Sequence, residues 1–292
     1  MAIEIVDRVT PLLKDRVRAL FRQLPPALAG DEEAIHQMRV AGRRLRVALP
    51  LLARKPSGRR VRRARRILQE LTRAAGTSRD LDVGVGLFEG RLKERAETDA
   101  ERRLLRQRLR SARRRSRLRM AEALMDIDIA RVRRDLRVVM SRRGDLVFTA
   151  LLRLREARDL RGTAILEALD TLGDAFDPAA LHRLRIRLRR LRYAAELAEK
   201  LTGQTTEAPG LFRQLQDALG EVRDAFVVAA WFGRQAAAAA GRGQATLTAA
   251  AREEEAFFLE KSHAHHRAFL ALSPAATVRR GLEAMGASRT AA

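Results

Sequence analysis

HQMRVAGRRLR, residues 36–46, and HRLRIRLRRLR, residues 182–192, are two copies of one pattern within a single chain. Each copy starts with a histidine and then repeats arginine at the third, seventh, eighth and tenth following positions. The matching pairs are His36 and His182, Arg39 and Arg185, Arg43 and Arg189, Arg44 and Arg190, and Arg46 and Arg192. A duplicated pattern with so many cations indicates a duplicated structural unit that binds an anionic partner.

The spacing within each copy predicts an amphipathic α-helix with two stripes. In the first copy the apolar stripe consists of Ile35, Met38, Leu45, Leu49 and Leu52. The cationic stripe lies about 110° around the helix and runs for about 15 Å, which suits a linear polyanion. Its predicted anion-binding members are His36, Arg39, Arg43 and Arg46, with His182, Arg185, Arg189 and Arg192 in the second copy. The same angle turns Arg44 and Arg190 away from the stripe.

Helical period continues along the chain, and alternating β-branched runs are nearly absent, so the fold should be all-α. Asp31 and Asp177 are expected to cap the two arginine-rich helices, the second with Pro178 in the first turn. Helix breaks are expected at Pro25-Pro26 with Gly30, at 55–58, at Gly144, at Asp177-Pro178, at 203–210 and at 241–243. Helices joined by such short connections predict antiparallel bundles.

A second motif follows each arginine-rich copy. LTRAAGTSRD, residues 71–80, matches LQDALGEVRD, residues 215–224, in its leucine, its glycine and its Arg-Asp pair. Two motifs repeated in the same order predict two related units, residues 1–143 and 144–292. Arg79 and Arg223, each followed by an acid, are interpreted as members of structural ion pairs.

Charge narrows the classes of function. The 292 residues carry a formal net charge of +23, mostly from arginine, and include no cysteine. Nucleic acid, a phosphate polymer or an anionic membrane surface could neutralise such an excess. With neither a leader segment nor a long apolar run in sight, we expect a soluble cytoplasmic protein without membrane association.

Ordinary solvated helix faces mix acids with bases, but residues 34–69 contain twelve Lys and Arg and no acid. Arg62 and Arg66, from the run RRVRRARR at 59–66, are therefore further candidates for phosphate binding. A second acid-free block, Arg102–Arg119, contains ten arginines. Sequence leaves open whether that block is another wall of the same site or only a basic outer face.

The compound pattern His-x-x-Arg-hydrophobic-x-x-Arg-Arg-Leu-Arg, present twice and each time followed by Leu-x(4)-Gly-x-x-Arg-Asp, resembles the CHAD family of histidine-bearing α-helical domains. The resemblance implies two tandem related bundles with a pseudo-twofold axis and a basic central groove or channel. It also implies binding of inorganic polyphosphate and association with polyphosphate granules, through the histidines and arginines of the two stripes. The carboxylate signature of the triphosphate-processing domain that often accompanies this family is not matched.

Polyphosphate suits the composition better than single-stranded nucleic acid, because aromatic residues that could stack on bases make up only 4% of the chain. A nucleic-acid-binding module remains an alternative, and weak nucleic-acid binding could also accompany polyphosphate binding. A polyphosphate-metabolising enzyme or its accessory is a further alternative. No catalytic residue set, metal site or cofactor is expected, and the HAHH segment at 263–266 is interpreted as a surface helix end. The neighbouring arginines should lower the pKa values of His36 and His182 in the empty site. A bound phosphate chain should raise these pKa values again and so link binding to protons.

Overall fold

The computed structural model describes residues 7–94, 99–141 and 146–287, and these residues form eleven α-helices and no strand. The predicted all-α fold is confirmed. The helices are α1 (Val9–Leu28), α2 (Glu32–Leu52), α3 (Arg59–Ala74), α4 (Gly76–Glu94), α5 (Ala100–Met125), α6 (Ile129–Ser141), α7 (Val147–Leu172), α8 (Pro178–Thr202), α9 (Ala208–Ala240), α10 (Ala245–Ala271) and α11 (Pro274–Ala287).

Both predicted caps start the arginine-rich helices. The Asp31 side chain accepts a hydrogen bond of 2.6 Å from the amide of Ala34 at the start of α2. Asp177 accepts from the amides of Ala179 and Ala180, at 2.8 and 3.1 Å, at the start of α8. Each cap satisfies amides that a helix start leaves without intrahelical partners, and so it fixes the residue at which the helix begins.

Most predicted breaks fall between helices, but of the break predicted at Pro25-Pro26 with Gly30 only the Gly30 part is confirmed. Both prolines lie inside the last turn of α1, and the helix continues to Leu28 although each proline lacks the amide that would complete one intrahelical hydrogen bond. The chain turns instead at Gly30, whose φ of +89° is readily adopted only by glycine. The breaks predicted at 55–58 and 241–243 lie between helices. The break predicted at 203–210 is confirmed for 203–207, but α9 already begins at Ala208, and Gly144 lies outside the described residues.

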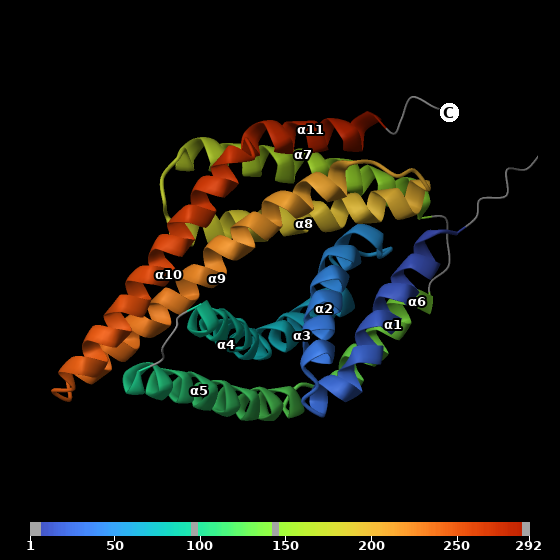
Figure 1. Ribbon diagram of the computed structural model, residues 1–292. Coiled ribbons are helices and arrows are strands. Elements are labelled where there is room, and N and C mark those ends of the chain that lie inside the picture. Colours follow the sequence, from blue (N-terminus) through green and yellow to red (C-terminus); the bar gives the residue numbers. More distant parts are fainter. Residues whose placement is uncertain (1–6, 95–98, 142–145, 288–292) are drawn as a thin grey trace, which may run out of the picture.

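Three clusters of buried apolar side chains hold the helices together. The first packs α1, α2, α3 and α6 against the ends of α5, α7 and α8. The second joins α4 and α5 to the C-terminal part of α9 and the N-terminal part of α10. The third joins α7, α8 and α11 to the N-terminal part of α9. Figure 1 shows α9 and α10 as a long pair reaching from α8 toward α5, with α2 near the middle of the molecule.

The first two clusters combine helices from both sequence halves, whereas all members of the third come from the second half. Helices α2 and α8, one from each half, are in contact. The division into units 1–143 and 144–292 stays a prediction, because the boundary region 142–145 lies outside the described residues. Within the described part of the chain, no helix combines the length and apolar character needed to cross a bilayer.

Candidate anion-binding site

The two arginine-rich helices, α2 and α8, pack against each other. His36 and His182 are each the fifth residue of their helix, since α2 begins at Glu32 and α8 at Pro178. The predicted apolar stripes are buried in the core, with Leu45 and Leu188 fully covered. The equivalent cationic stripes therefore face the same region of the molecule.

A pocket of about 510 Å³ lies between α2, α3, α7 and α8, and we refer to it as the arginine pocket. Its walls carry arginines from all four helices, and none of its lining residues is acidic. The seven arginines are Arg43, Arg46, Arg65, Arg161, Arg187, Arg189 and Arg190. Guanidinium groups gathered without a counter-charge repel one another, so an anion that neutralises them should bind favourably.

The arginines of the pocket lie close enough to one another to lower each other's pKa values. Burial and the nearby Arg43 lower the pKa of Arg189 to about 9. The pKa of Arg46 and that of Arg161 are also lowered, first by burial and then by Arg190. A pKa of about 9 leaves Arg189 charged at neutral pH, so the pocket keeps its positive charge.

Farther along the stripes, Arg39 and Arg185 each lie against the second motif of their own sequence half. The Nη1 atom of Arg39 donates to the carbonyls of Ala75 and Gly76, the latter at 3.0 Å. At the equivalent Gly220, a Cβ atom would lie 3.1 Å from Nη2 of Arg185, so the glycine leaves room for that guanidinium. The two motifs that repeat together in sequence thus meet in space.

Arg223 links the two sequence halves through an ion pair with Asp80 at 2.6 Å, and it also contacts Asp224 at 3.3 Å. Its interpretation as a structural ion-pair member is confirmed. For Arg79 the same interpretation is wrong, since no carboxylate within the described ranges pairs with it. Its charge instead contributes to lowering the pKa of the neighbouring His36.

Both histidines are partly buried beside arginines. Burial lowers the pKa of His36, and Arg79 lowers it further. Burial likewise lowers the pKa of His182, with Arg223 as the next cause. The predicted direction agrees with the structure, although loss of hydration rather than the neighbouring cations is the larger cause.

Of the ten predicted ligands, Arg43, Arg46 and Arg189 line the arginine pocket. His36, Arg39, His182 and Arg185 do not line it but continue the two stripes, and the other three lie elsewhere. Arg192 is buried, with its Nε atom 3.5 Å from Glu196, which also pairs with Arg44 at 3.2 Å. Arg62 and Arg66 are exposed on α3, where Arg62 donates to its own N-terminal loop and Arg66 lies 3.9 Å from Glu70. None of the three lines the arginine pocket.

Sequence reasoning missed Arg65, Arg161, Arg187, Arg190 and the buried Tyr193 as pocket residues. Arg190 is predicted to point away from the stripe. It nevertheless lines the arginine pocket, because residues of α3 and α7 form further walls of that pocket. Arg65 lay in the acid-free run and could have been included with its neighbours. For Arg161 the sequence offers no signal, because α7 contains both acids and bases.

The open question about residues 102–119 is answered for four of the arginines, which form ion pairs with neighbouring helices. Arg102 is buried against Glu254 at 2.7 Å. The other three pair with acids from α2 and α4, namely Arg110 with Glu89, and Arg113 and Arg117 with Glu32 and Asp82. These arginines attach α5 to the fold, and none lines the arginine pocket.

The HAHH segment is only partly a surface helix end. His265 lies 3.3 Å from Glu221, but His266 is buried, and the ring of His263 packs 3.9 Å from that of Phe176. The prediction is wrong for His266, because α10 runs five residues further and packs this turn against α9. Across the described residues, no group of three or more histidines and carboxylates is placed to bind a metal ion.

Comparisons with known proteins bear on the whole arrangement. The family model for the CHAD domain matches residues 12–233. Among solved structures, the crystal structure of the CHAD domain from the plant Ricinus communis is similar, with a TM-score of 0.64 and 21% sequence identity. The alignment covers 96% of this chain and 92% of that one. The search among curated proteins gives no match.

Proposed function

Because the chain belongs to the CHAD domain family, we propose that it binds inorganic polyphosphate through the arginine pocket and the stripes of α2 and α8. The family is linked in general with polyphosphate binding. The observation that carries the proposal for this chain is a pocket with seven arginines and no acid among its lining residues. Phosphate oxygens accept paired hydrogen bonds from guanidinium groups, and a polymer offers them at regular intervals.

The arrangement favours a chain of phosphates over one phosphate. Arginines continue from Arg46 and Arg190 at one end to Arg39 and Arg185 at the other, where the histidines follow. Burial and the adjacent Arg43 lower the pKa of Arg39 to about 10, so charge repulsion extends beyond the pocket itself. A linear polyanion would neutralise these groups together.

Nucleic acid is the competing ligand. Of the residues that line the arginine pocket, Tyr193 alone is aromatic, and it is buried with guanidinium groups of Arg44 and Arg192 near its ring. A buried ring cannot serve as a platform for a splayed base. Duplex DNA needs no such platform, so it must be tested directly.

The test is a titration of the purified protein with long-chain polyphosphate at about 150 mM salt, with RNA and duplex DNA as competitors at equal phosphate concentration. We expect polyphosphate to bind most tightly, with affinity that falls steeply as salt is raised. Equal competition by either nucleic acid would overturn polyphosphate as the specific ligand.

We further propose that binding is not coupled to catalysis and that the protein collects at polyphosphate granules in the cytoplasm. The proposal draws on the composition of the arginine pocket, which offers guanidinium groups and no carboxylate for general acid or base chemistry. Incubation of the protein with polyphosphate and Mg²⁺ should leave the length of the polyphosphate unchanged, as measured on a gel. Shortened chains or released phosphate would contradict it.

Proton-linked binding is a further prediction. The charged groups around His36 are Glu33, Arg39, Arg43 and Arg79. With a lowered pKa in the empty protein, each histidine binds fewer protons folded than unfolded, so the empty fold loses stability as pH falls below about 6.5. A bound anion should raise the pKa and reverse this sign.

Polyphosphate affinity should therefore increase several-fold as pH falls from about 7.5 to 5.5, with proton uptake measured by calorimetry in buffers of different ionisation enthalpy. His182 lies among Arg185, Arg189, Arg223 and Asp80 and should behave alike. Replacing both histidines by glutamine should remove the pH dependence but leave the salt dependence. A pH response that persists in this variant would contradict the role of the histidines.

A further inference from the structure

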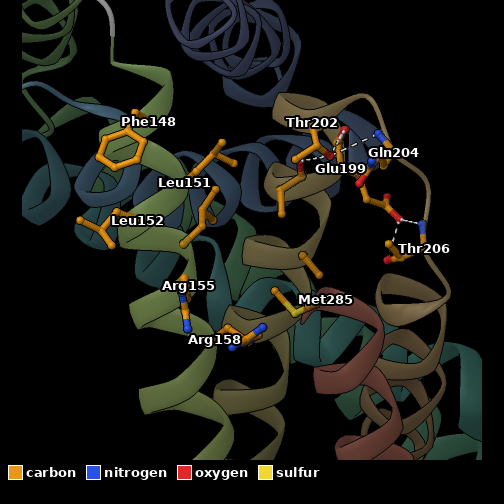
Figure 2. A pocket seen from close by; sticks show the side chains of 13 residues that line it. Phe148, Leu151, Leu152, Arg155, Arg158, Glu199, Thr202, Gln204, Thr206 and Met285 are labelled. Atoms are coloured by element: carbon orange, nitrogen blue, oxygen red, sulfur yellow. Dashed lines mark hydrogen bonds between the residues drawn. The ribbon is translucent and has the colours of Figure 1, made fainter. Parts of the chain in front are cut away.

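A second pocket of about 510 Å³ differs in character from the arginine pocket. It lies between α7 and α8, and Met285 of α11 closes one side (Figure 2). Phe148, Leu151 and Leu152 come from α7, while Ala195 and Ala198 of α8 open the space by their small size. We refer to it as the apolar pocket. Its volume lies within the range of about 300–1,000 Å³ that is usual for small-molecule sites.

Two large side chains at its rim are unusually exposed. Phe148 is 75% exposed and Leu152 is 47% exposed, although α7 turns Leu154 of the same stretch into the core. Phe148 and Leu152 are one helical turn apart and so lie on the same face. Apolar side chains gathered beside a cavity mark a surface that gains free energy when it is covered.

The charged groups of the apolar pocket are unevenly placed. Figure 2 shows Arg155 and Arg158 at one end and Glu199, with Thr206, at the other. Glu199 accepts from the amide and hydroxyl of Thr206, at 2.7 and 3.2 Å, so its charge is engaged with the α8–α9 connection. Arg158 pairs with Asp159 at 2.7 Å. Arg155 is exposed, and no carboxylate of the described ranges forms an ion pair with it.

An apolar cavity with a guanidinium at one end is complementary to an amphiphile with one anionic head. The geometry points to a binding site for a medium-chain aliphatic carboxylate, whose chain packs on Phe148, Leu151, Leu152 and Met285 and whose carboxylate meets Arg155. This inference does not rest on the proposed function, because polyphosphate has no apolar part that could occupy such a surface. The two sites share no lining residue.

Binding is tested with sodium decanoate, kept below its micelle concentration and followed by the methyl signals of the six methionines in ¹³C-labelled protein. We expect the Met285 signal, assigned with Met285→Leu, to shift saturably with decanoate. Dodecanoate should bind roughly tenfold more tightly than decanoate, since each buried methylene adds to the affinity. 1-Decanol, which has the same chain without the charge, should bind several-fold more weakly than decanoate.

Two variants locate the chain and the head. Leu152→Gln is expected to weaken decanoate binding about tenfold, whereas Leu118→Gln, at a leucine of α5 that is 66% exposed, should have no effect. Arg155→Gln should lower the affinity for decanoate to that for 1-decanol. Arg137→Gln, at an exposed arginine of α6, should leave the affinity for decanoate unchanged. All four positions are exposed, so folding should be retained and thermal unfolding checks it.

Three outcomes would overturn the inference. One is the absence of a saturable Met285 shift, and another is decanoate binding that Leu152→Gln leaves unchanged. The third is displacement of decanoate by polyphosphate, which would place the carboxylate in the arginine pocket. Failure of polyphosphate binding, with decanoate binding intact, would count against the proposed function alone.

Discussion

Replacing Arg43 and Arg189 together by alanine is expected to weaken polyphosphate binding by roughly 100-fold or more, because each charged hydrogen bond contributes about 1.5–3 kcal/mol. These two residues come from equivalent positions of α2 and α8 and line the same pocket. Burial lowers the pKa of Arg189 to about 9, and Arg43 contributes further. Removing both charges relieves their repulsion, so the empty double variant should unfold at a temperature no lower than that of the wild type. Calorimetric titration and thermal unfolding measure the two effects.

A matched control separates the site from net charge. Arg134 and Arg137 are exposed on α6 and do not line the arginine pocket, so their double alanine variant removes the same charge from another surface. That control should lose only a few-fold in affinity, through the general field of the protein. If both double variants lost affinity equally, polyphosphate would be binding to diffuse positive charge, and the arginine pocket would have no special role.

The sequence predicts the helices of the site well because local rules determine them. Asp31 and Asp177 are caps whose effect extends over three or four residues, and the leucine period decides which face is buried. Since both caps stand at the same distance from the histidine, the two stripes start in the same register. These features depend on neighbours in sequence, which is why they could be read without the structure.

Contacts between distant helices could not be predicted in the same way. Arg161 lines the arginine pocket because α7 packs beside α8, and Arg102 is buried because α10 brings Glu254 to it. Nothing local distinguishes a paired arginine from one that lacks a carboxylate partner. Residues 102–119 look as basic as residues 59–66, and in both blocks arginines pair with acids of other helices, as Arg113 does with Asp82 and Arg63 with Asp135.

The second motif shows how identical patterns can fold differently. Residues 71–80 span the junction at which α3 ends and α4 begins, whereas residues 215–224 lie within the uninterrupted helix α9. At the junction, the carbonyls of Ala75 and Gly76 accept hydrogen bonds from Arg39. In α9 the corresponding carbonyls belong to a continuous helix, and Gly220 instead gives space to Arg185. The motif thus supports the same stripe position by two different contacts.

The second large effect is expected in stability. The Glu254 side chain is completely buried, and its Oε1 atom accepts from Nε of Arg102 at 2.7 Å. Burial opposes the charge of Arg102, but hydrogen bonds to Glu254, Glu253 and Asp99 more than compensate and raise its pKa. Arg102 therefore stays charged at any pH at which the protein is folded. If Glu254 were removed, the guanidinium of Arg102 would remain buried and would keep Glu253 and Asp99 as its carboxylate partners.

Glu254→Ala should lower the free energy of unfolding by about 1.5–3 kcal/mol, because one buried charged hydrogen bond is lost while Asp99 and Glu253 still pair with Arg102. Glu260→Ala is the control on the same helix, because Glu260 is 69% exposed and its pair with Arg267 should contribute less than about 1 kcal/mol. Urea unfolding at 25 °C measures both. Polyphosphate affinity should be unchanged in either variant under conditions in which each is fully folded, since α5 and α10 attach to the fold away from the arginine pocket. Loss of affinity in Glu254→Ala without loss of stability would place the α5 arginines in the anion site and contradict their structural role.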